Sequence, residues 1–245
     1  MHSEGASNAS IGNENAGVKR FAVFFIVSGF FSVLFSVYPE IDILVSGLFY
    51  DADNGFFLRK NFFLVFLYES IEVFVPAVIV FCLLSIVFFR LKRKKIFGLG
   101  CSGALYLLVA LAVGPGLLVN GILKEFWGRA RPSTIEEFGG KMIFTPALLP
   151  SNQCESNCSF ASGHASAGFF PVSMSFVWRK HRKKFFCAGI LYGIMAGFAR
   201  IAQGGHFLSD VVFAGLIVYG ISWLLWSLYE RLQRATPLRQ VLNKR

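Results

Sequence analysis

Six stretches of the chain are strongly apolar and carry almost no charge, and polar segments separate them. They are 14 to 28 residues long, and a helix needs about 20 apolar residues to cross the hydrocarbon core of a bilayer. The runs are Phe21–Tyr38, Phe62–Phe89, Ile96–Leu123, Ala165–Trp178, Phe185–Phe198 and Leu208–Tyr229. The pattern therefore predicts an all-α, polytopic membrane protein with six transmembrane helices.

Three of these runs need an adjustment at their ends. The second run carries Glu69 and Glu72 near its start, so we expect the membrane-spanning part to begin close to Ile71. The fourth and fifth runs are short for a span, and we expect each to extend into the polar residues beside it.

The two ends of the chain differ from its apolar middle. Residues 1–18 are rich in Ser, Asn, Gly and Glu, which predicts a short disordered tail rather than a signal peptide. We expect the membrane domain to cover residues 19–232 and a basic tail to cover residues 233–245.

The composition supports the prediction of a membrane protein. Hydrophobic residues make up 55% of the chain and charged residues 16%, against about 25% charged in an average soluble domain. The mean hydropathy of +0.58 excludes a disordered chain, a collagen, a disulfide-dense mini-protein and most soluble enzymes.

The basic residues are unevenly divided between the two sides that six crossings create. Of the 24 Lys and Arg residues, 17 lie on the side of the termini and 7 on the opposite side. Cytoplasmic loops carry the excess of basic residues, so both termini are predicted to be cytoplasmic. The loops 39–61, 124–163 and 200–207 then lie outside. Because topology explains the net charge of +10, we expect no nucleic-acid partner.

The outer ends of the predicted spans hold charged and imidazole groups that the charge bias does not explain. Ionisable residues at a membrane boundary are costly, so they are candidate functional residues. Any single one could instead cap a helix or reach to the interface. They are Lys124, Arg129, Arg131, His164, Arg200, His206 and Asp210. Their collection on one face of the membrane favours a functional site.

Two of these groups are spaced for imidazole chemistry. His206 and Asp210 are four residues apart, which on a helix places them on one face. A carboxylate in that position can accept the imidazole N–H, fix its tautomer and leave the other ring nitrogen free to react.

His164 lies beside a predicted anion site. It follows Ser162 and Gly163 and precedes a helix start of small residues at 165–168. Backbone N–H groups at a helix N-terminus bind anions, and Gly163 lets a ligand approach them. The cations that suit a phosphoryl transition state are Lys124, Arg131 and Arg200.

This set of groups predicts phosphoryl transfer without a metal. One His would attack phosphorus while the other protonates the leaving oxygen. The few outer carboxylates show no metal-ligand spacing, so we expect neither a metal nor another cofactor.

The five cysteines fall into two groups. Cys82, Cys101 and Cys187 lie within predicted spans and are expected to be ordinary small apolar residues. Cys154 and Cys158 share an outer loop, where they form either a disulfide in an oxidising compartment or two free thiols. A zinc site needs more ligands than this pair supplies.

Three motifs carry a family resemblance. In chain order they are Lys124-x6-Arg131-Pro132, Ser162-Gly163-His164 and Arg200-x5-His206-x3-Asp210. They resemble the motifs of the type-2 phosphatidic acid phosphatase superfamily over roughly residues 97–229. Two positions depart from the pattern, with Ala161 where Pro is usual and Ala199 where Ser is usual. Both departures leave the charged and imidazole groups intact.

The resemblance implies a six-helix membrane bundle with its site at the outer leaflet. It implies that His206 is the nucleophile and becomes phosphohistidine, and that Asp210 orients it. It makes His164 the general acid, which later helps to activate water. The residues implied to hold the phosphate are Lys124, Arg131, Ser162, Gly163 and Arg200.

A narrower resemblance concerns the substrate. The segments Val113–Asn120, Trp127–Pro132 and Gln153–Phe160 resemble the lipid A 4'-phosphatases of Gram-negative bacteria, and Leu44–Phe57 fits them less specifically. Those enzymes remove a phosphate from the distal glucosamine of lipid A. The resemblance implies a bacterial inner-membrane enzyme with a periplasmic active site. Its substrate would be lipid A or a phospholipid of the outer leaflet, with no obligate protein partner.

Other functions stay open from the sequence. The alternative lipid phosphatases are a lipid A 1-phosphatase, an undecaprenyl diphosphate phosphatase and a phosphatidylglycerophosphate phosphatase. A non-enzymatic transporter of anionic lipids is less consistent with two imidazoles and a carboxylate, and the chain shows no internal repeat. The long loop Ser133–Ser159 is either a substrate-recognition lid or a connector.

Overall fold

The computed structural model describes residues 21–235. The predicted tail 1–18 lies outside these residues, as does the predicted basic tail beyond residue 235. The described chain is mostly helical. Its elements are the helix Phe21–Val37, α2 (Glu40–Gly47), β1 (Tyr50–Asp51), β2 (Gly55–Phe56), α3 (Phe62–Lys92), α4 (Cys101–Leu111), the π-helix η1 (Ala112–Leu123), α5 (Lys124–Phe126), the 3₁₀ turns η2 (Pro132–Thr134) and η3 (Glu136–Phe138), α6 (Gly163–Phe169), α7 (Pro171–Val177), the 3₁₀ turn η4 (Arg179–His181), α8 (Arg182–Ala202) and α9 (Leu208–Ala235).

Within residues 21–235, four helices are long and apolar enough to cross a membrane. They are Phe62–Lys92, Cys101–Phe126, Arg179–Ala202 and Leu208–Gln233. The helix Phe21–Val37 and α2 form a pair bent by 83°, which raises the number to five if the pair is one broken span. The membrane character predicted from the apolar runs is thus confirmed as four to five candidate spans.

The fourth predicted span is not one continuous helix. It is divided into α6 and α7 at Phe170. Pro171 is the first residue of α7, where the missing N–H of proline costs least. Each of the two helices has seven residues, which is too short to cross a bilayer alone.

Helix α3 begins earlier than the position near Ile71 expected for its membrane-spanning part. It begins at Phe62, because the Asn61 side chain caps the helix and accepts hydrogen bonds from Phe63 N at 3.0 Å and Leu64 N at 3.3 Å. The helix therefore has 31 residues.

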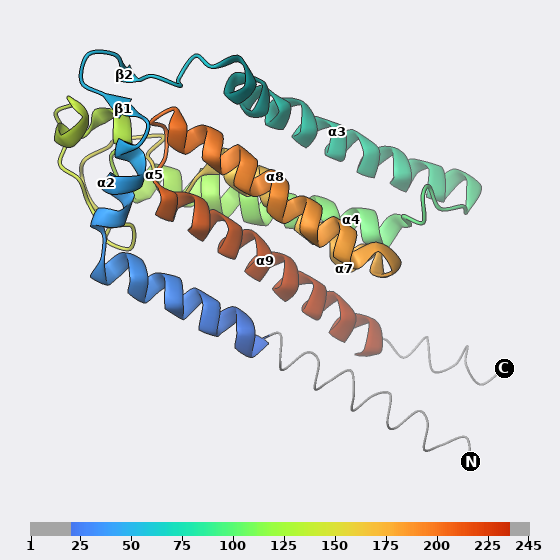
Figure 1. Cartoon of the computed structure of the whole chain (residues 1–245). Coiled ribbons are helices and arrows are strands. Elements are labelled where there is room, and N and C mark those ends of the chain that lie inside the picture. Colours follow the sequence, from blue (N-terminus) through green and yellow to red (C-terminus); the bar gives the residue numbers. More distant parts are fainter. Residues whose placement is uncertain (1–20, 236–245) are drawn as a thin grey trace.

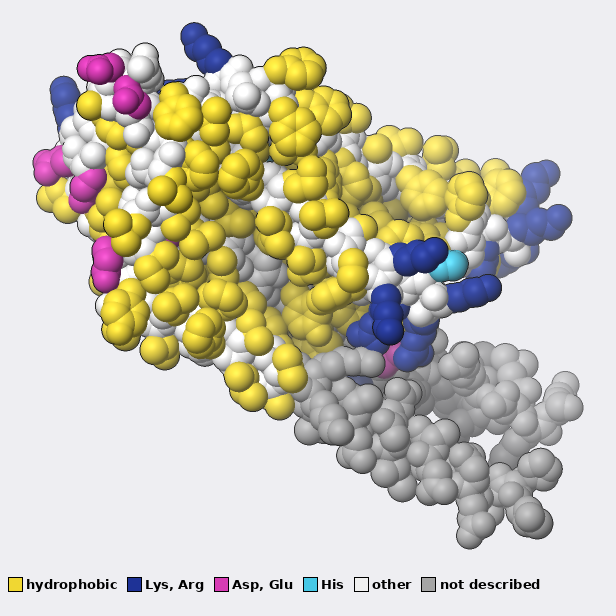
Figure 2. Space-filling model, in the orientation of Figure 1, with side chains coloured by type: hydrophobic (Ala, Val, Ile, Leu, Met, Phe, Trp, Pro, Cys, Tyr) yellow, Lys and Arg dark blue, Asp and Glu magenta, His cyan; other side chains and the backbone are white. Residues whose placement is uncertain are grey.

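The long helices lie side by side, and the irregular segments gather at one end of the bundle (Figure 1). That end holds α2, the hairpin of β1 and β2, and the loop between α5 and α6. The described chain starts and finishes toward the opposite end. Hydrophobic side chains cover the middle of the molecule in Figure 2, Lys and Arg gather at the end where the described chain starts and finishes, and Asp and Glu gather at the other.

Helix α6 is held in place by close contacts with α8 and α9. A Cβ atom at Gly193 of α8 would collide with the Phe169 ring, and one at Gly197 would collide with Val211 of α9. These glycines therefore let the three helices approach closely. The packing fixes the N-terminus of α6, which carries the second motif, at the irregular end of the bundle.

The long loop between α5 and α6 is built onto the segment that follows α5. Trp127 Nε1 donates to the carbonyl of Ala147 at 2.7 Å, and Ser151 Oγ donates to the carbonyl of Gly128 at 2.7 Å. Gly128 has a φ of +70°, and a Cβ there would collide with the Ser151 carbonyl. The first motif, Lys124 to Pro132, and the loop 133–159 are thus packed together as one unit.

Candidate active site

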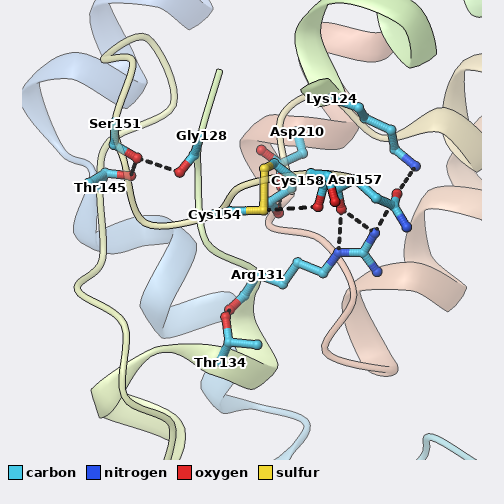
Figure 3. Close-up of a disulfide and its surroundings, with 12 residues drawn as sticks. Lys124, Gly128, Arg131, Thr134, Thr145, Ser151, Cys154, Asn157, Cys158 and Asp210 are labelled. Carbon is cyan, nitrogen blue, oxygen red and sulfur yellow. Dashed lines mark hydrogen bonds between the residues drawn. A yellow bond between two sulfur atoms is a disulfide. The ribbon is translucent and has the colours of Figure 1, made fainter. Parts of the chain in front are cut away.

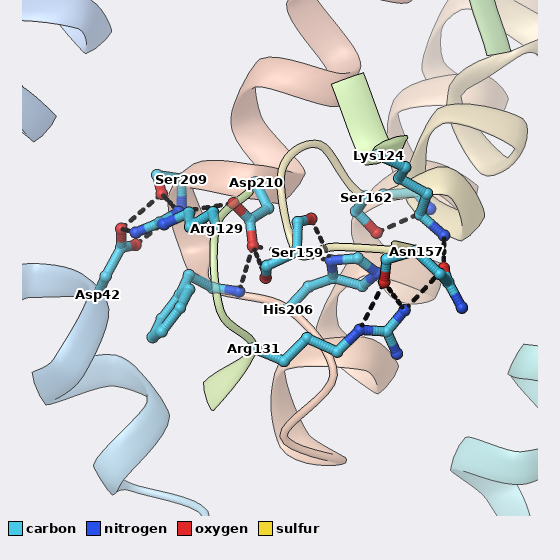
Figure 4. A network of polar contacts seen from close by, with 12 residues as sticks. Asp42, Lys124, Arg129, Arg131, Asn157, Ser159, Ser162, His206, Ser209 and Asp210 are labelled. Atoms are coloured by element: carbon cyan, nitrogen blue, oxygen red, sulfur yellow. Dashed lines mark hydrogen bonds and ion pairs between the residues drawn. The ribbon is translucent and has the colours of Figure 1, made fainter. Parts of the chain in front are cut away.

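The three sequence motifs converge at the irregular end of the bundle. The first motif lies at α5 and just after it, the second at the start of α6, and the third across the connection between α8 and α9. Figure 4 shows residues of all three motifs in one network of polar contacts.

His206 lies in the connection between α8 and α9 and is 1% exposed. Its Nδ1 is 2.7 Å from the carbonyl oxygen of Ser159, which can only accept, so Nδ1 carries the proton. Nε2 therefore keeps its lone pair. Burial lowers the pKa of His206 to about 4, against the opposing effect of the nearby Asp210 carboxylate, so the ring is neutral at pH 7.

Asp210 does not directly accept the hydrogen bond from the His206 ring that the four-residue spacing predicts. His206 precedes the first residue of α9, Leu208, so the i, i+4 geometry of a helix does not apply. The Asp210 Oδ2 atom is 3.7 Å from His206 Nδ1 and accepts instead from Ser159 Oγ at 2.5 Å and from Phe207 N at 2.8 Å. Asp210 thus holds Ser159 in place, and the carbonyl of Ser159 in turn orients the His206 ring.

The other oxygen of Asp210 binds Arg129, which is fully buried. Arg129 Nη1 donates to Asp210 Oδ1 at 2.6 Å and to Ser209 Oγ at 2.8 Å. Its Nη2 donates to Asp42 Oδ2 at 2.8 Å, and its Nε donates to the carbonyl of Thr145 at 2.8 Å. Arg129, a basic residue that the three motifs do not include, is therefore the ion-pair partner of Asp210 (Figure 4).

The two cations of the first motif meet at Asn157. Lys124 Nζ donates to Asn157 Oδ1 at 3.1 Å. Arg131 donates from Nη2 to the same Oδ1 at 2.8 Å, and from Nη2 and Nε to the Asn157 carbonyl at 2.7 and 3.2 Å. Asn157 therefore holds two mutually repelling cations side by side, as Figures 3 and 4 show.

A disulfide joins Cys154 and Cys158, with a Cα–Cα distance of 5.6 Å. Asn157 lies inside the five-residue segment that the disulfide closes, and it adopts a left-handed backbone with a φ of +50°. The Cys158 N–H donates to the carbonyl of Lys124 at 2.8 Å. The disulfide segment is therefore attached directly to the phosphate-binding cations predicted from the sequence (Figure 3).

Arg200 is the third predicted cation, and it has an unused donor. Its Nη1 donates to Gln203 Oε1 at 2.8 Å, and the guanidinium carbon lies 5.0 Å from the centre of the Tyr68 ring. Its Nε is buried without a hydrogen-bond partner in the described part of the chain. A Cβ at Gly205 would collide with the guanidinium. A buried donor of this kind fits an anionic ligand.

The second motif forms the start of α6. Ser162 is the N-cap, and its Oγ accepts from Ala165 N at 3.4 Å. A Cβ at Gly163 would collide with the side-chain oxygen of Asn120 and would lie 3.3 Å from Lys124 Nζ. The absence of a side chain at Gly163 thus brings the helix start next to a cation, as an anion site requires.

His164 stacks on Tyr68, with 4.0 Å between the ring centroids and 24° between the planes. Tyr68 comes from α3 and contacts two groups of the site, the His164 ring and the Arg200 guanidinium. Burial and, next to it, the charge of Arg200 lower the pKa of His164 to about 3, so this ring too is neutral at pH 7. The two imidazoles come from different motifs, at the start of α6 and in the connection between α8 and α9.

An open cavity of about 210 Å³ adjoins these residues. Its polar lining consists of Arg59, Tyr68, Arg131, Ser133, Arg200 and Gln203. The two His residues are not part of this lining, but His164 stacks on Tyr68, which is. Three arginines in one cavity suit an anionic substrate.

Sequence reasoning missed several residues of the site. Asn157 and Ser159 lie in the segment Gln153–Phe160 that carries the narrower resemblance, but the sequence assigns them no role. Tyr68 and Asp42 lie outside the motifs, and of these two only Asp42 gives a sequence signal, as a charge next to apolar residues. Ala161 and Ala199, the two residues that differ from the family motifs, are both fully buried in apolar clusters.

Comparison with known proteins agrees with this geometry. Residues 103–234 match the model of the PAP2 superfamily. The chain belongs to the PAP2 superfamily. It is therefore an enzyme, a phosphoric monoester hydrolase, and a multi-pass membrane protein of bacterial type.

Individual relatives are consistent with that membership. A lipid A 4'-phosphatase of Francisella tularensis subsp. novicida (strain U112) is 37% identical over 216 residues, which cover 84% of this chain and 94% of that protein. Phosphatidylglycerophosphatase B of Bacillus subtilis (strain 168) is 31% identical over 114 residues, 43% of this chain and 49% of that protein.

A solved structure shares the fold. It is the crystal structure of the first transmembrane PAP2 type phosphatidylglycerolphosphate phosphatase from Bacillus subtilis, with a TM-score of 0.57 and 19% identity. The match covers 88% of this chain and 98% of that one.

Proposed function

We propose that this protein removes the 4'-phosphate of lipid A at the periplasmic face of the bacterial inner membrane. The observation that carries the proposal is the 37% identity to a lipid A 4'-phosphatase along 94% of that relative. The site supports the chemistry, because a neutral buried imidazole, a second imidazole and three cations lie together at one end of the bundle.

The reaction has two steps. In the first, His164 is in its protonated form, because the bound phosphate anion offsets the charges of the surrounding cations. The lone pair of His206 Nε2 attacks phosphorus while the bond to the leaving oxygen breaks and the His164 imidazolium gives that oxygen a proton. In the second, His164 takes a proton from water, whose oxygen attacks phosphorus and releases His206 and inorganic phosphate. Lys124, Arg131 and Arg200 stabilise the charge on the phosphoryl oxygens throughout.

The bond from His206 Nδ1 to the Ser159 carbonyl serves both steps. It fixes the tautomer in which Nε2 is the nucleophile, and it persists in the phosphohistidine because Nδ1 keeps its proton. Asp210 supports this arrangement through Ser159 and through the backbone of Phe207.

The proposal includes six membrane crossings with both termini in the cytoplasm. It is supported by the excess of Lys and Arg at the end where the described chain starts and finishes, and by the site at the opposite end (Figures 1 and 2). The broken helix α6–α7 would be the crossing that is not a single apolar helix, and it is covered by α8 and α9.

A topology test uses a reporter that is active only in the periplasm. Inserted in the loop 133–159 it should be active, and inserted near Lys183 it should be inactive. The reverse pattern would place the site in the cytoplasm and reject the proposed face.

A second candidate substrate is phosphatidylglycerophosphate. Two observations favour it, the partial match to phosphatidylglycerophosphatase B and the fold shared with a phosphatidylglycerolphosphate phosphatase. The longer and closer match to the lipid A enzyme favours lipid A.

The deciding experiment gives purified protein each lipid in separate reactions, with the His206→Ala variant as the control. We expect mass spectrometry to find loss of the 4'-phosphate of lipid A in the wild-type reaction alone. Faster dephosphorylation of phosphatidylglycerophosphate, or loss of the 1-phosphate instead, would replace the proposed substrate.

A further inference from the structure

Asp42 is a buried carboxylate that reaches the active site from outside the family segment. It lies on α2, whereas the family match covers residues 103–234. It is 0% exposed, although the helix it belongs to is only eight residues long and presents Glu40 and Leu44 to the exterior. A charge in such a position is kept only if it is paired.

The pairing leads directly to the catalytic carboxylate. Asp42 Oδ2 accepts from Arg129 Nη2 at 2.8 Å, and Arg129 Nη1 donates to Asp210 Oδ1 at 2.6 Å. Ser209, which precedes Asp210, also donates to Asp42, from its N–H to Oδ1 at 2.8 Å and from its hydroxyl to Oδ2 at 2.5 Å. Asp42 therefore contacts both the partner and the neighbour of Asp210 (Figure 4).

The charges of this group have a specific balance. Arg129 carries one positive charge, which by itself would cancel the charge of Asp210. Burial raises the pKa of Asp42, and the hydrogen bonds that it accepts from Arg129 and Ser209 oppose this by favouring the ionised carboxylate. With Asp42 ionised, the three side chains carry a net charge of −1, buried next to His206. The Arg129 guanidinium does not reach solvent. It also donates to the carbonyl of Thr145, and its central carbon lies 4.3 Å from the centre of the Phe207 ring.

The reaction makes this balance relevant. When His206 Nε2 forms a bond to phosphorus, the ring keeps its Nδ1 proton and becomes positively charged. A neighbouring group of net charge −1 stabilises that charge in a buried site, whereas a neutral Arg129–Asp210 pair does so far less.

We propose that Asp42 is a positioning residue of the phosphatase, which offsets the charge of Arg129 so that Asp210 stays effectively anionic beside His206. The proposal rests on the proposed phosphohistidine chemistry. Asp42 touches neither the substrate nor the reacting atoms; it acts through Arg129 and Ser209. A purely structural role, in which Asp42 only fastens α2 to the start of α9, makes different predictions.

The first test is Asp42→Asn, which keeps the shape and removes the charge. Its control is Glu40→Gln, which removes the same charge from an exposed position of the same helix. With para-nitrophenyl phosphate as the substrate, we expect Asp42→Asn to lower kcat about 10- to 100-fold, the range typical when a partner behind the directly acting ligands of a metal site is replaced. We expect its KM to stay unchanged, and Glu40→Gln to match the wild type.

The second test is the double variant Asp42→Asn with Arg129→Gln, which restores the net charge of −1. We expect it to be faster than Asp42→Asn alone, per folded molecule as determined by thermal unfolding of each sample. A structural fastener predicts the opposite, because the double variant loses more contacts. A single variant within twofold of Glu40→Gln, or a double variant no faster than Asp42→Asn, would overturn the proposal.

The wild type in the same assay separates this proposal from the proposed chemistry. Trapped wild-type protein should carry phosphate on a histidine. If it turns over substrate without that intermediate, the phosphohistidine mechanism is wrong. The comparison of Asp42→Asn with Glu40→Gln and with the double variant still decides whether the charge of Asp42 supports turnover.

Discussion

Replacing Arg200 by Lys tests whether the unused donor of this residue binds the reacting phosphate. The Nε of Arg200 is buried without a partner in residues 21–235, while its Nη1 is held by Gln203. A lysine keeps the positive charge but has a single donor atom, so it cannot reproduce the fork that a guanidinium offers to two phosphate oxygens.

The expected loss follows from one charge-assisted hydrogen bond. Such a bond contributes about 1.5–3 kcal/mol, which corresponds to a decrease in kcat/KM of roughly 10- to 150-fold. The measurement is kcat/KM for para-nitrophenyl phosphate, together with the inhibition constant of inorganic phosphate, which should rise for the variant. The matched control is Lys141→Gln, on the loop between α5 and α6 and outside the cavity lining. A value of kcat/KM for Arg200→Lys within threefold of the wild type would refute the role assigned to Nε.

Three further predictions test the other groups of the site. His164→Ala should cost about 100- to 10,000-fold in kcat for a lipid phosphate, whose leaving oxygen needs a proton, but under about 10-fold for para-nitrophenyl phosphate, whose leaving group does not; equal losses on both would reject the general acid. Burial lowers the pKa of His206 to about 4, so the acid limb of a pH profile of kcat/KM should lie well below pH 6.5. Between about pH 6.5 and pH 4 only the unfolded chain binds a proton at this ring, so the free energy of unfolding should decrease as the pH falls through that range. An acid limb at pH 6.5 would contradict the buried neutral ring. Arg59→Gln should raise KM about 3- to 10-fold for lipid A and leave KM for para-nitrophenyl phosphate unchanged, since Arg59 lines the cavity but belongs to none of the three motifs; equal effects on both substrates would contradict a role in binding the rest of the lipid.

Much of the site was predictable because its groups lie in local motifs. Lys124 and Arg131 are one short segment apart, and Ser162, Gly163 and His164 are consecutive. The polar and charged residues at the ends of apolar runs were therefore enough to predict that these groups lie at one end of the bundle.

The remaining contacts depend on chain segments that are distant in sequence. Asp42 and Arg129 are 87 residues apart, and no local pattern couples them. The carbonyl of Ser159 replaces the Asp210 carboxylate as the acceptor of His206, because α9 begins only after His206. Backbone acceptors carry no residue-type signal, so a sequence pattern favours the carboxylate.

The fourth apolar run shows a second limit. Its composition predicts a span, and it is indeed buried, but Phe170 and Pro171 divide it into two helices. Apolar character reports burial in either protein or lipid, and packing against α8 and α9 is what makes a broken helix tolerable here.

The most direct test of the central claim is to locate the phosphate on the enzyme during turnover. Wild-type protein would be mixed with excess para-nitrophenyl phosphate, quenched in alkali to preserve phosphohistidine, digested and sequenced by mass spectrometry. We predict phosphate on His206 in the wild type and none in the His206→Ala variant. Phosphate on His164, or full turnover by the His206→Ala variant, would contradict the claim that His206 is the nucleophile.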